Sequence, residues 1–200
     1  MELGIDILAM LFAAAFIAAF IDAIAGGGGL ITIPALLMTG MPPAMALGTN
    51  KLQAFGGALS ASIYFLRKRA VNLSEFSFIL LVIFIGSVIG TLLIQSLDAS
   101  LIKKGLPFLI LAIGLYFLLT PKLGESDRKQ RISYGVFALC FGSLLGFYDG
   151  FFGPGTGSLM NLACVTLLGF NLTKATAHAK VMNLTSNFAS LIFFFIGGHV

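Results

Sequence analysis

Two acidic and two basic side chains stand at comparable places in a chain that is otherwise mostly apolar. Asp22 and Asp149 each come about one helical turn before a glycine-rich run, and Lys51 and Lys180 follow those runs. Ionisable residues inside membrane segments usually face a bundle interior or a cavity and mark pathways for ions or protons. The acids are therefore candidates for carrying a proton or for pairing with a lysine, and the lysines for attracting an anion.

The glycine-rich runs offer a second kind of chemistry. Four consecutive glycines occupy positions 26–29, although each glycine costs a helix roughly 0.5–1 kcal/mol relative to alanine. A second run, GPGTGS, begins at Gly153. Glycine runs beside short apolar segments are typical of discontinuous membrane helices, where freed backbone N–H groups and the positive end of the helix dipole favour an anion. Close helix packing is the alternative role, because glycine is common in membrane helices.

Composition places these residues in a lipid bilayer. The chain of 200 residues is 58% hydrophobic and 10% charged, with a mean hydropathy of +1.01. A soluble domain carries about 25% charged residues. The basic residues gather in RKR at 67–69 and SDRKQR at 126–131, which indicates two cytoplasmic loops rather than a nucleic-acid-binding surface. The two cysteines lie in apolar segments and are read as small buried hydrophobic residues.

An all-α, polytopic transmembrane helical bundle is the predicted fold. Spanning a bilayer takes about 20 mostly apolar residues, and a helix of about ten reaches only halfway. Six segments approach full length, at about 7–25, 50–66, 74–97, 101–119, 132–150 and 180–197. Two shorter apolar segments lie at about 30–39 and 159–168. In this assignment Lys51 begins its helix near the outer edge of the membrane core, and inverted symmetry would place Lys180 at the opposite mouth of a pathway. A lysine at either place could attract an anion or could simply reach for the interface.

An internal repeat relates the two halves of the chain. At an offset of 129 residues Gly26 meets Gly155, Gly28 meets Gly157, and Lys51 meets Lys180, whereas the two aspartates need a further slip of two residues. The first copy begins outside and the second inside, so the repeats would be inverted, as in many secondary transporters. We assign the first transmembrane repeat to 1–125 and the second, incomplete one to 126–200. Both glycine runs are predicted to break helices at membrane depth and to meet near the centre.

The candidate site follows from these motifs. The residues predicted to bind a substrate anion are Gly26, Gly27, Gly28, Gly29, Thr49, Asn50, Lys51, Gly153, Gly155, Gly157, Lys180 and Asn183. The candidates for proton coupling are Asp22, Asp149 and His178, with structural ion pairs, helix caps and a structural histidine as the alternatives. We expect no catalytic residue, metal site or cofactor. The small-residue patterns GSVIG at 86–90 and GSLLG at 142–146 are predicted to pack helices closely.

The motifs also resemble a known family. GGGGLITIPALLMTG followed by ALGTNK, with the weaker second copy GPGTGSLMNLACVTLLGFNLTKATAHAK, is similar to the TauE/SafE sulfite-exporter family, and most to its YfcA-like members. The resemblance covers essentially the whole chain and implies a multi-pass transporter of the bacterial inner membrane that moves small, often sulfur-containing, anions such as sulfite or sulfonates. The second copy departs from the family pattern, because Thr156 and Ser158 interrupt its glycines and Asn161 replaces proline.

Two other classes of function remain open at this point. An intramembrane serine protease could use Ser158 and His178, although the order Gly-Thr-Gly-Ser-Leu is not the expected Gly-x-Ser-Gly. A membrane scaffold without transport is the other alternative. We also expect the second repeat to be incomplete, because counterparts of 74–97 and 101–119 would require roughly 50 further residues. A homodimer that covers an open flank is the alternative arrangement.

Overall fold

The described part of the chain is helical throughout. The structure, a computed structural model, describes residues 4–119 and 129–200, so the first half of the predicted basic loop at 126–131 lies outside the described residues. No strand occurs within these two ranges, and the all-α prediction is confirmed. The helices of the first half are α1 (Ile5–Ala25), α2 (Gly29–Met38), α3 (Pro43–Arg67), α4 (Leu73–Ser96) and α5 (Ala99–Leu119). Those of the second are α6 (Tyr134–Val136), a π-helical stretch (Phe137–Gly142), α7 (Ser143–Phe151), α8 (Thr156–Leu167) and α9 (Leu172–Ile196).

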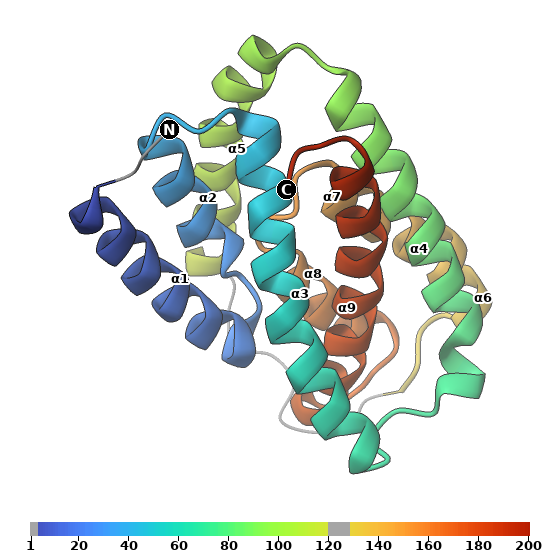
Figure 1. Ribbon diagram of the computed structural model, residues 1–200. Coiled ribbons are helices and arrows are strands. Elements are labelled where there is room, and N and C mark those ends of the chain that lie inside the picture. Colours follow the sequence, from blue (N-terminus) through green and yellow to red (C-terminus); the bar gives the residue numbers. More distant parts are fainter. Residues whose placement is uncertain (1–3, 120–128) are drawn as a thin grey trace.

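The two halves repeat one arrangement in opposite directions. In each, a long helical segment ends at a glycine break, a short helix turns back, and a 25-residue helix follows. Figure 1 shows that α2 returns toward the end of the molecule where the chain begins, and that α3 and α9 lie side by side and run in opposite directions. This geometry is that of an inverted repeat. The helices α1, α2 and α5 lie on one side of the α3–α9 pair, and α4 with α6 and α7 on the other (Figure 1).

The glycine runs break their helices and meet, as predicted. The segment α1 ends at Gly26, which has a φ of 76°, and α8 follows Gly155, which also has a φ of 76°. A Cβ atom on Gly26 would lie only 2.7 Å from the carbonyl carbon of Gly157, and the Ser158 amide donates to the Gly26 carbonyl at 3.1 Å. Glycine at 26 is therefore required by both the left-handed backbone and the close approach.

The predicted starts of the two long helices are wrong. We expected 50–66 and 180–197, but α3 begins at Pro43 and α9 at Leu172. Proline suits the first turn of a helix, and Asn171 caps α9 by accepting from the Lys174 amide at 2.9 Å. Lys51 and Lys180 each lie eight residues after the first residue of their helix, which is about 12 Å along the axis. Both lysines are buried in the protein, so neither reaches out to a membrane interface.

Close backbone contact between α4 and α7 confirms the role of the small-residue patterns. A Cβ on Gly86 would lie 2.6 Å from the Ser143 carbonyl oxygen, and Gly90 packs in the same way on the carbonyl of Phe147. On the facing helix, Gly150 lies against the Ser87 carbonyl. These glycines let two helix backbones approach without intervening side chains, which is how membrane helices commonly pack.

Apolar clusters hold the remaining elements together. One cluster joins α4, α8 and α9 with the π-helical stretch around Ile83, Phe137, Met160 and Met182, all 0% exposed. The sequence offered no signal for that π-helical stretch. A second cluster joins α2, α3 and α5 with α4 and α9, and it contains Ile33, Leu47, Ile94, Ile102, Leu106 and Phe194.

Four of the described helical segments are long and apolar enough to cross a membrane, whereas we expected six. They are Ile5–Ala23, Leu73–Ser96, Tyr134–Phe151 and Leu172–Ile196. The helix α3 is as long as α9, but its sequence is not apolar enough to place it among these four. Large apolar side chains such as Phe12 and Phe16 are exposed on α1, as expected of a surface that faces lipid. Cys164 is buried, but Cys140 is exposed, and both are free thiols.

Candidate functional site

Two ion pairs join the halves of the molecule. Lys51 on α3 lies 2.9 Å from Asp149 on α7, measured from Nζ to Oδ2, and Lys180 on α9 lies 3.7 Å from Asp22 on α1. Each pair therefore takes its lysine from one repeat and its aspartate from the other. Asp22 also lies within electrostatic range of Lys51. We call Asp22, Lys51, Asp149 and Lys180 the charged cluster, and its formal charge is zero when all four side chains are ionised.

The Lys51–Asp149 pair is closed off from the surface. The lysine side chain is 1% exposed and the aspartate side chain 2% exposed. Gly153, with a φ of 90°, makes room for it, because a Cβ at this position would lie 2.8 Å from the lysine Nζ. A buried pair of this kind is strongly destabilised when one partner is removed, because the other charge is left unpaired.

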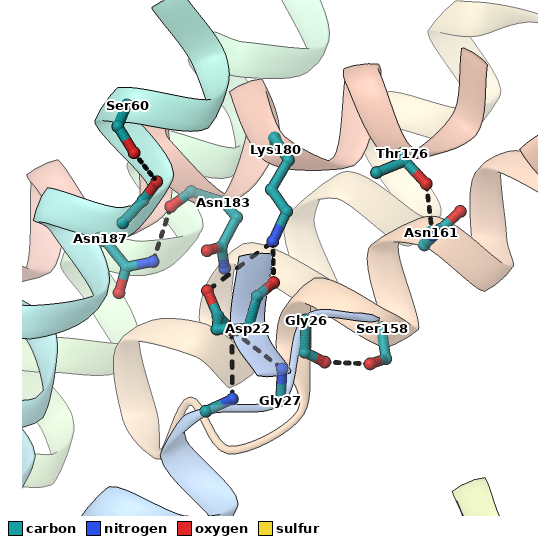
Figure 2. A network of polar contacts seen from close by, with 12 residues as sticks. Asp22, Gly26, Gly27, Ser60, Ser158, Asn161, Thr176, Lys180, Asn183 and Asn187 are labelled. Carbon is teal, nitrogen blue, oxygen red and sulfur yellow. Dashed lines mark hydrogen bonds and ion pairs between the residues drawn. The ribbon is translucent and has the colours of Figure 1, made fainter. Parts of the chain in front are cut away.

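The Asp22 carboxylate lies at the start of α2. Its Oδ1 accepts hydrogen bonds from the backbone amides of Gly27, at 2.9 Å, and Gly28, at 3.2 Å. Lys180 approaches Oδ2 and also donates to the main-chain carbonyl of Asp22 (Figure 2). Backbone amides at a helix N-terminus together with a lysine form an arrangement suited to an oxyanion. In this structure the protein's own carboxylate fills it.

Asn50 borders the same helix start. Its side-chain amide packs against Gly29, the first residue of α2, where a Cβ would lie 3.3 Å from Nδ2 and 3.4 Å from Oδ1. Asn50 is 4% exposed, and its Oδ1 has no hydrogen-bond partner among the described residues. The Cα of Pro154 also lies 3.4 Å from the position of that Cβ, so Gly29 sits between the two repeats.

The remaining predicted residues divide into two groups. Gly26, Gly155 and Gly157 shape the junction of the two breaks described above. Asn183 is buried on α9, and Figure 2 places it beside the Lys180–Asp22 pair. Thr49, by contrast, donates its hydroxyl to the Met41 sulfur at 3.9 Å.

His178 is not part of the charged cluster. Its Nδ1 lies 2.7 Å from the Lys174 carbonyl, and its ring centroid lies 4.6 Å from that of Phe76 and 4.7 Å from that of Phe170. These contacts give it a structural place in an aromatic cluster. Ser158 instead donates its hydroxyl to the Gly26 carbonyl (Figure 2). Ser158 therefore contacts the glycine junction, whereas His178 contacts aromatic side chains.

Sequence reasoning missed the residues that make the two breaks different. Pro154 stands five residues after Asp149, where Gly27 stands after Asp22, and proline has no N–H to donate. Tyr148 stabilises this second turn by donating its hydroxyl to the Pro154 carbonyl at 2.6 Å. The proline is visible in the sequence GPGTGS. Its effect depends on whether a backbone amide of the turn could donate to the carboxylate of the preceding aspartate, and the sequence alone does not show this. Within the described ranges no three His, Cys, Asp or Glu residues gather as a metal site would require.

Comparison with known proteins identifies the family. The family model described as "Sulfite exporter TauE/SafE" matches residues 11–200. The chain belongs to the TauE/SafE family. A relative from Haemophilus influenzae (strain Rd), a "Probable membrane transporter protein", is 74% identical over 200 residues, which are 100% of this chain and 78% of the relative. The "Probable membrane transporter protein YfcA" of Escherichia coli K12 is 57% identical over 195 residues, 97% of this chain and 72% of the relative.

A more distant relative comes from Bacillus subtilis. The "Probable membrane transporter protein YunE" of Bacillus subtilis is 24% identical over an alignment of 202 positions, which covers 87% of this chain and 72% of the relative. No solved structure matches the chain. The TauE/SafE relatives carry the names of membrane transporters rather than of enzymes, and the apolar helices of this member make it a membrane protein.

Proposed function

We propose that this protein exports a small anion across the bacterial inner membrane. The observation that carries the proposal is the charged cluster, which joins both repeats at the place where their helix breaks meet. In secondary transporters with inverted repeats, substrate sites lie at such junctions of discontinuous helices. The backbone amides and lysines would replace the hydration shell of the anion, and no covalent chemistry is required. The name of the family model supports sulfite or a related sulfonate as the substrate.

Charge balance in the cluster supports coupling to protons. Two lysines and two aspartates give a formal charge of zero, so an added anion would leave an uncompensated negative charge inside the protein. Such a charge is costly in a medium of low dielectric constant. A proton on one aspartate removes that cost and frees its lysine for the anion. We therefore expect one proton to accompany each negative charge of the substrate.

The basic loops support a multi-pass orientation with their end of the molecule in the cytoplasm. Arg67 ends α3 and Lys68 and Arg69 follow it, and the Arg131 amide donates to the Leu167 carbonyl at 3.0 Å, at the end of α8. Figure 1 shows the end of α3 and the end of α8 at the same end of the molecule. Positively charged loops favour the cytoplasmic side.

Anion flux into proteoliposomes tests this proposal. Sulfite, thiosulfate, a sulfonate and a carboxylate would be compared, each with and without a pH gradient. We expect flux of at least one sulfur oxyanion that increases with the gradient and falls strongly in Lys180→Met. Lys68→Met is the matched control, because this exposed lysine lies in the loop after α3. A folded protein that moves none of these anions would contradict the proposal and favour a scaffold.

A further inference from the structure

We propose that the Asp22 carboxylate occupies the substrate-anion position in the resting protein, and that the substrate's oxyanion group replaces it on Gly27, Gly28 and Lys180. This assignment rests on the proposed transport function and names its binding position. The ligand class is a small oxyanion with a carboxylate-like or sulfonate-like face, because two neighbouring amides contact a single oxygen of Asp22 while a lysine approaches the other.

The first argument is the fit between the Asp22 contacts and an anion site. The Gly27 and Gly28 amides precede the 10-residue helix α2, whose positive dipole end points toward the same carboxylate. Lys180 adds a full positive charge at 3.7 Å, which is longer than a tight ion pair. The Asp22 side chain is 17% exposed, so an external anion can reach this position more easily than the enclosed Asp149.

The second argument is a polar group, unpaired within the described ranges, at Gly29, the residue that directly follows the Gly27 and Gly28 amides. Asn50 is almost completely buried against the first residue of α2, and its Oδ1 has no partner among the described residues. A buried polar atom without a partner costs free energy unless a ligand or water satisfies it. The Asp22 carboxylate cannot do so, because it has no proton to donate. A bound oxyanion that carries a proton, such as hydrogen sulfite, can donate to this oxygen.

The third argument is the difference between the two repeats. Asp149 also precedes a glycine break, two residues out of register with Asp22 in the repeat, but the residue five positions after it is Pro154, whereas the residue five positions after Asp22 is Gly27, whose amide contacts the carboxylate. The carboxylate of Asp149 therefore depends on Lys51, at 2.9 Å, and both side chains are enclosed. We assign the Lys51–Asp149 pair to holding the repeats together and the Asp22 position to the substrate.

For the substrate to replace the Asp22 carboxylate, that carboxylate must either be neutralised by a proton or move away from Gly27, Gly28 and Lys180. The charged groups around it are Lys180 from α9 and, at longer range, Lys51 from α3, whose own partner is Asp149 from α7. A proton that binds Asp22 leaves Lys180 without its counter-ion, and the substrate oxyanion then supplies the negative charge. Proton and anion would enter together and leave together.

Anion rescue of Asp22→Ala tests the assignment. The purified, detergent-solubilised full chain would be heated in formate, acetate, sulfite or chloride, and the unfolding midpoint recorded. An oxyanion at about ten times its dissociation constant should raise the midpoint of Asp22→Ala by roughly 3–6 °C for a chain of this size. The wild-type protein should gain much less, because its own carboxylate competes. Asp149→Ala is the matched control and should show no greater gain than the wild type.

The outcomes separate this inference from the proposed function. Equal anion stabilisation in the wild type and Asp22→Ala, or an equal gain in Asp149→Ala, overturns the assignment. If Asp22→Ala does not fold, Asp22→Asn is measured instead, since it keeps the shape but removes the competing charge, and the same comparison decides. Wild-type flux without rescue would leave transport intact and disprove the site. Rescue without wild-type flux would support the site and contradict transport.

Discussion

At Gly153 a single methyl group is enough to disturb an ion pair. We predict that Gly153→Ala destabilises the protein, because its φ of 90° is unfavourable for alanine, by about 1–2 kcal/mol, and because the new Cβ would lie 2.8 Å from the Lys51 Nζ. Thermal unfolding in detergent measures the loss. Gly56→Ala is the control, since Gly56 is exposed within α3 with nothing within 4 Å of its Cβ position. Similar midpoints for the two variants would contradict the prediction.

The contribution of the Lys51–Asp149 pair to stability can be measured with single and double variants. Lys51→Met should cost about 3–5 kcal/mol, because it leaves the Asp149 carboxylate buried and unpaired. The double variant Lys51→Met/Asp149→Leu should recover most of that stability, since apolar residues of similar size can replace a buried ion pair. Unfolding midpoints of the single and double variants check this. A double variant no more stable than the single one would show that the pair is not an isolated structural contact.

At the scale of elements, the α4–α7 interface leaves no room for added side-chain volume at Gly86 and Gly90. Gly90→Ala places a Cβ against the carbonyl of Phe147, and overpacking of this kind typically costs about 1–3 kcal/mol. We expect a lower unfolding midpoint and more aggregation on size-exclusion chromatography. Gly114→Ala on α5 is the control, because nothing lies within 4 Å of its Cβ position. Equal unfolding midpoints for Gly90→Ala and Gly114→Ala would contradict the prediction that the α4–α7 interface cannot accept an added methyl group.

The sequence predicted the elements better than their ends. The breaks at Gly26 and Gly153–Gly157 were predictable because a run of glycines is unfavourable in a continuous helix and recurs here beside two short apolar segments. The early start of α3 was missed, because GTN at 48–50 is typical of a loop, and packing against other helices overrides that local preference. The crossed pairing of Lys51 with Asp149 was also missed. Partners between repeats depend on the angle at which two inverted units pack, and spacing along one chain does not determine that angle.

At the scale of the whole molecule, the inverted arrangement predicts which loops face the cytoplasm. A cysteine at Lys68→Cys, after α3, should react with a membrane-impermeant maleimide only after the inner membrane is opened. A cysteine at Asp98→Cys, between α4 and α5, should react in intact cells whose outer membrane is permeable to the reagent. Cys140→Ser removes the exposed native thiol, and Cys164 is buried. The opposite labelling pattern would reverse the proposed orientation.

The crossed ion pairs have a consequence for the ancestry of the fold. A contact in which residue i of one unit meets residue j of the other, and j meets i, is the signature of a two-fold symmetric dimer. Lys51 with Asp149 and Lys180 with Asp22 follow this rule between the two repeats. A half-length ancestor that inserted into the membrane in both orientations would have formed both pairs as an antiparallel dimer before its gene was duplicated and fused. Fusion then freed the two copies to diverge, and the two aspartates now stand two residues out of register in the repeat.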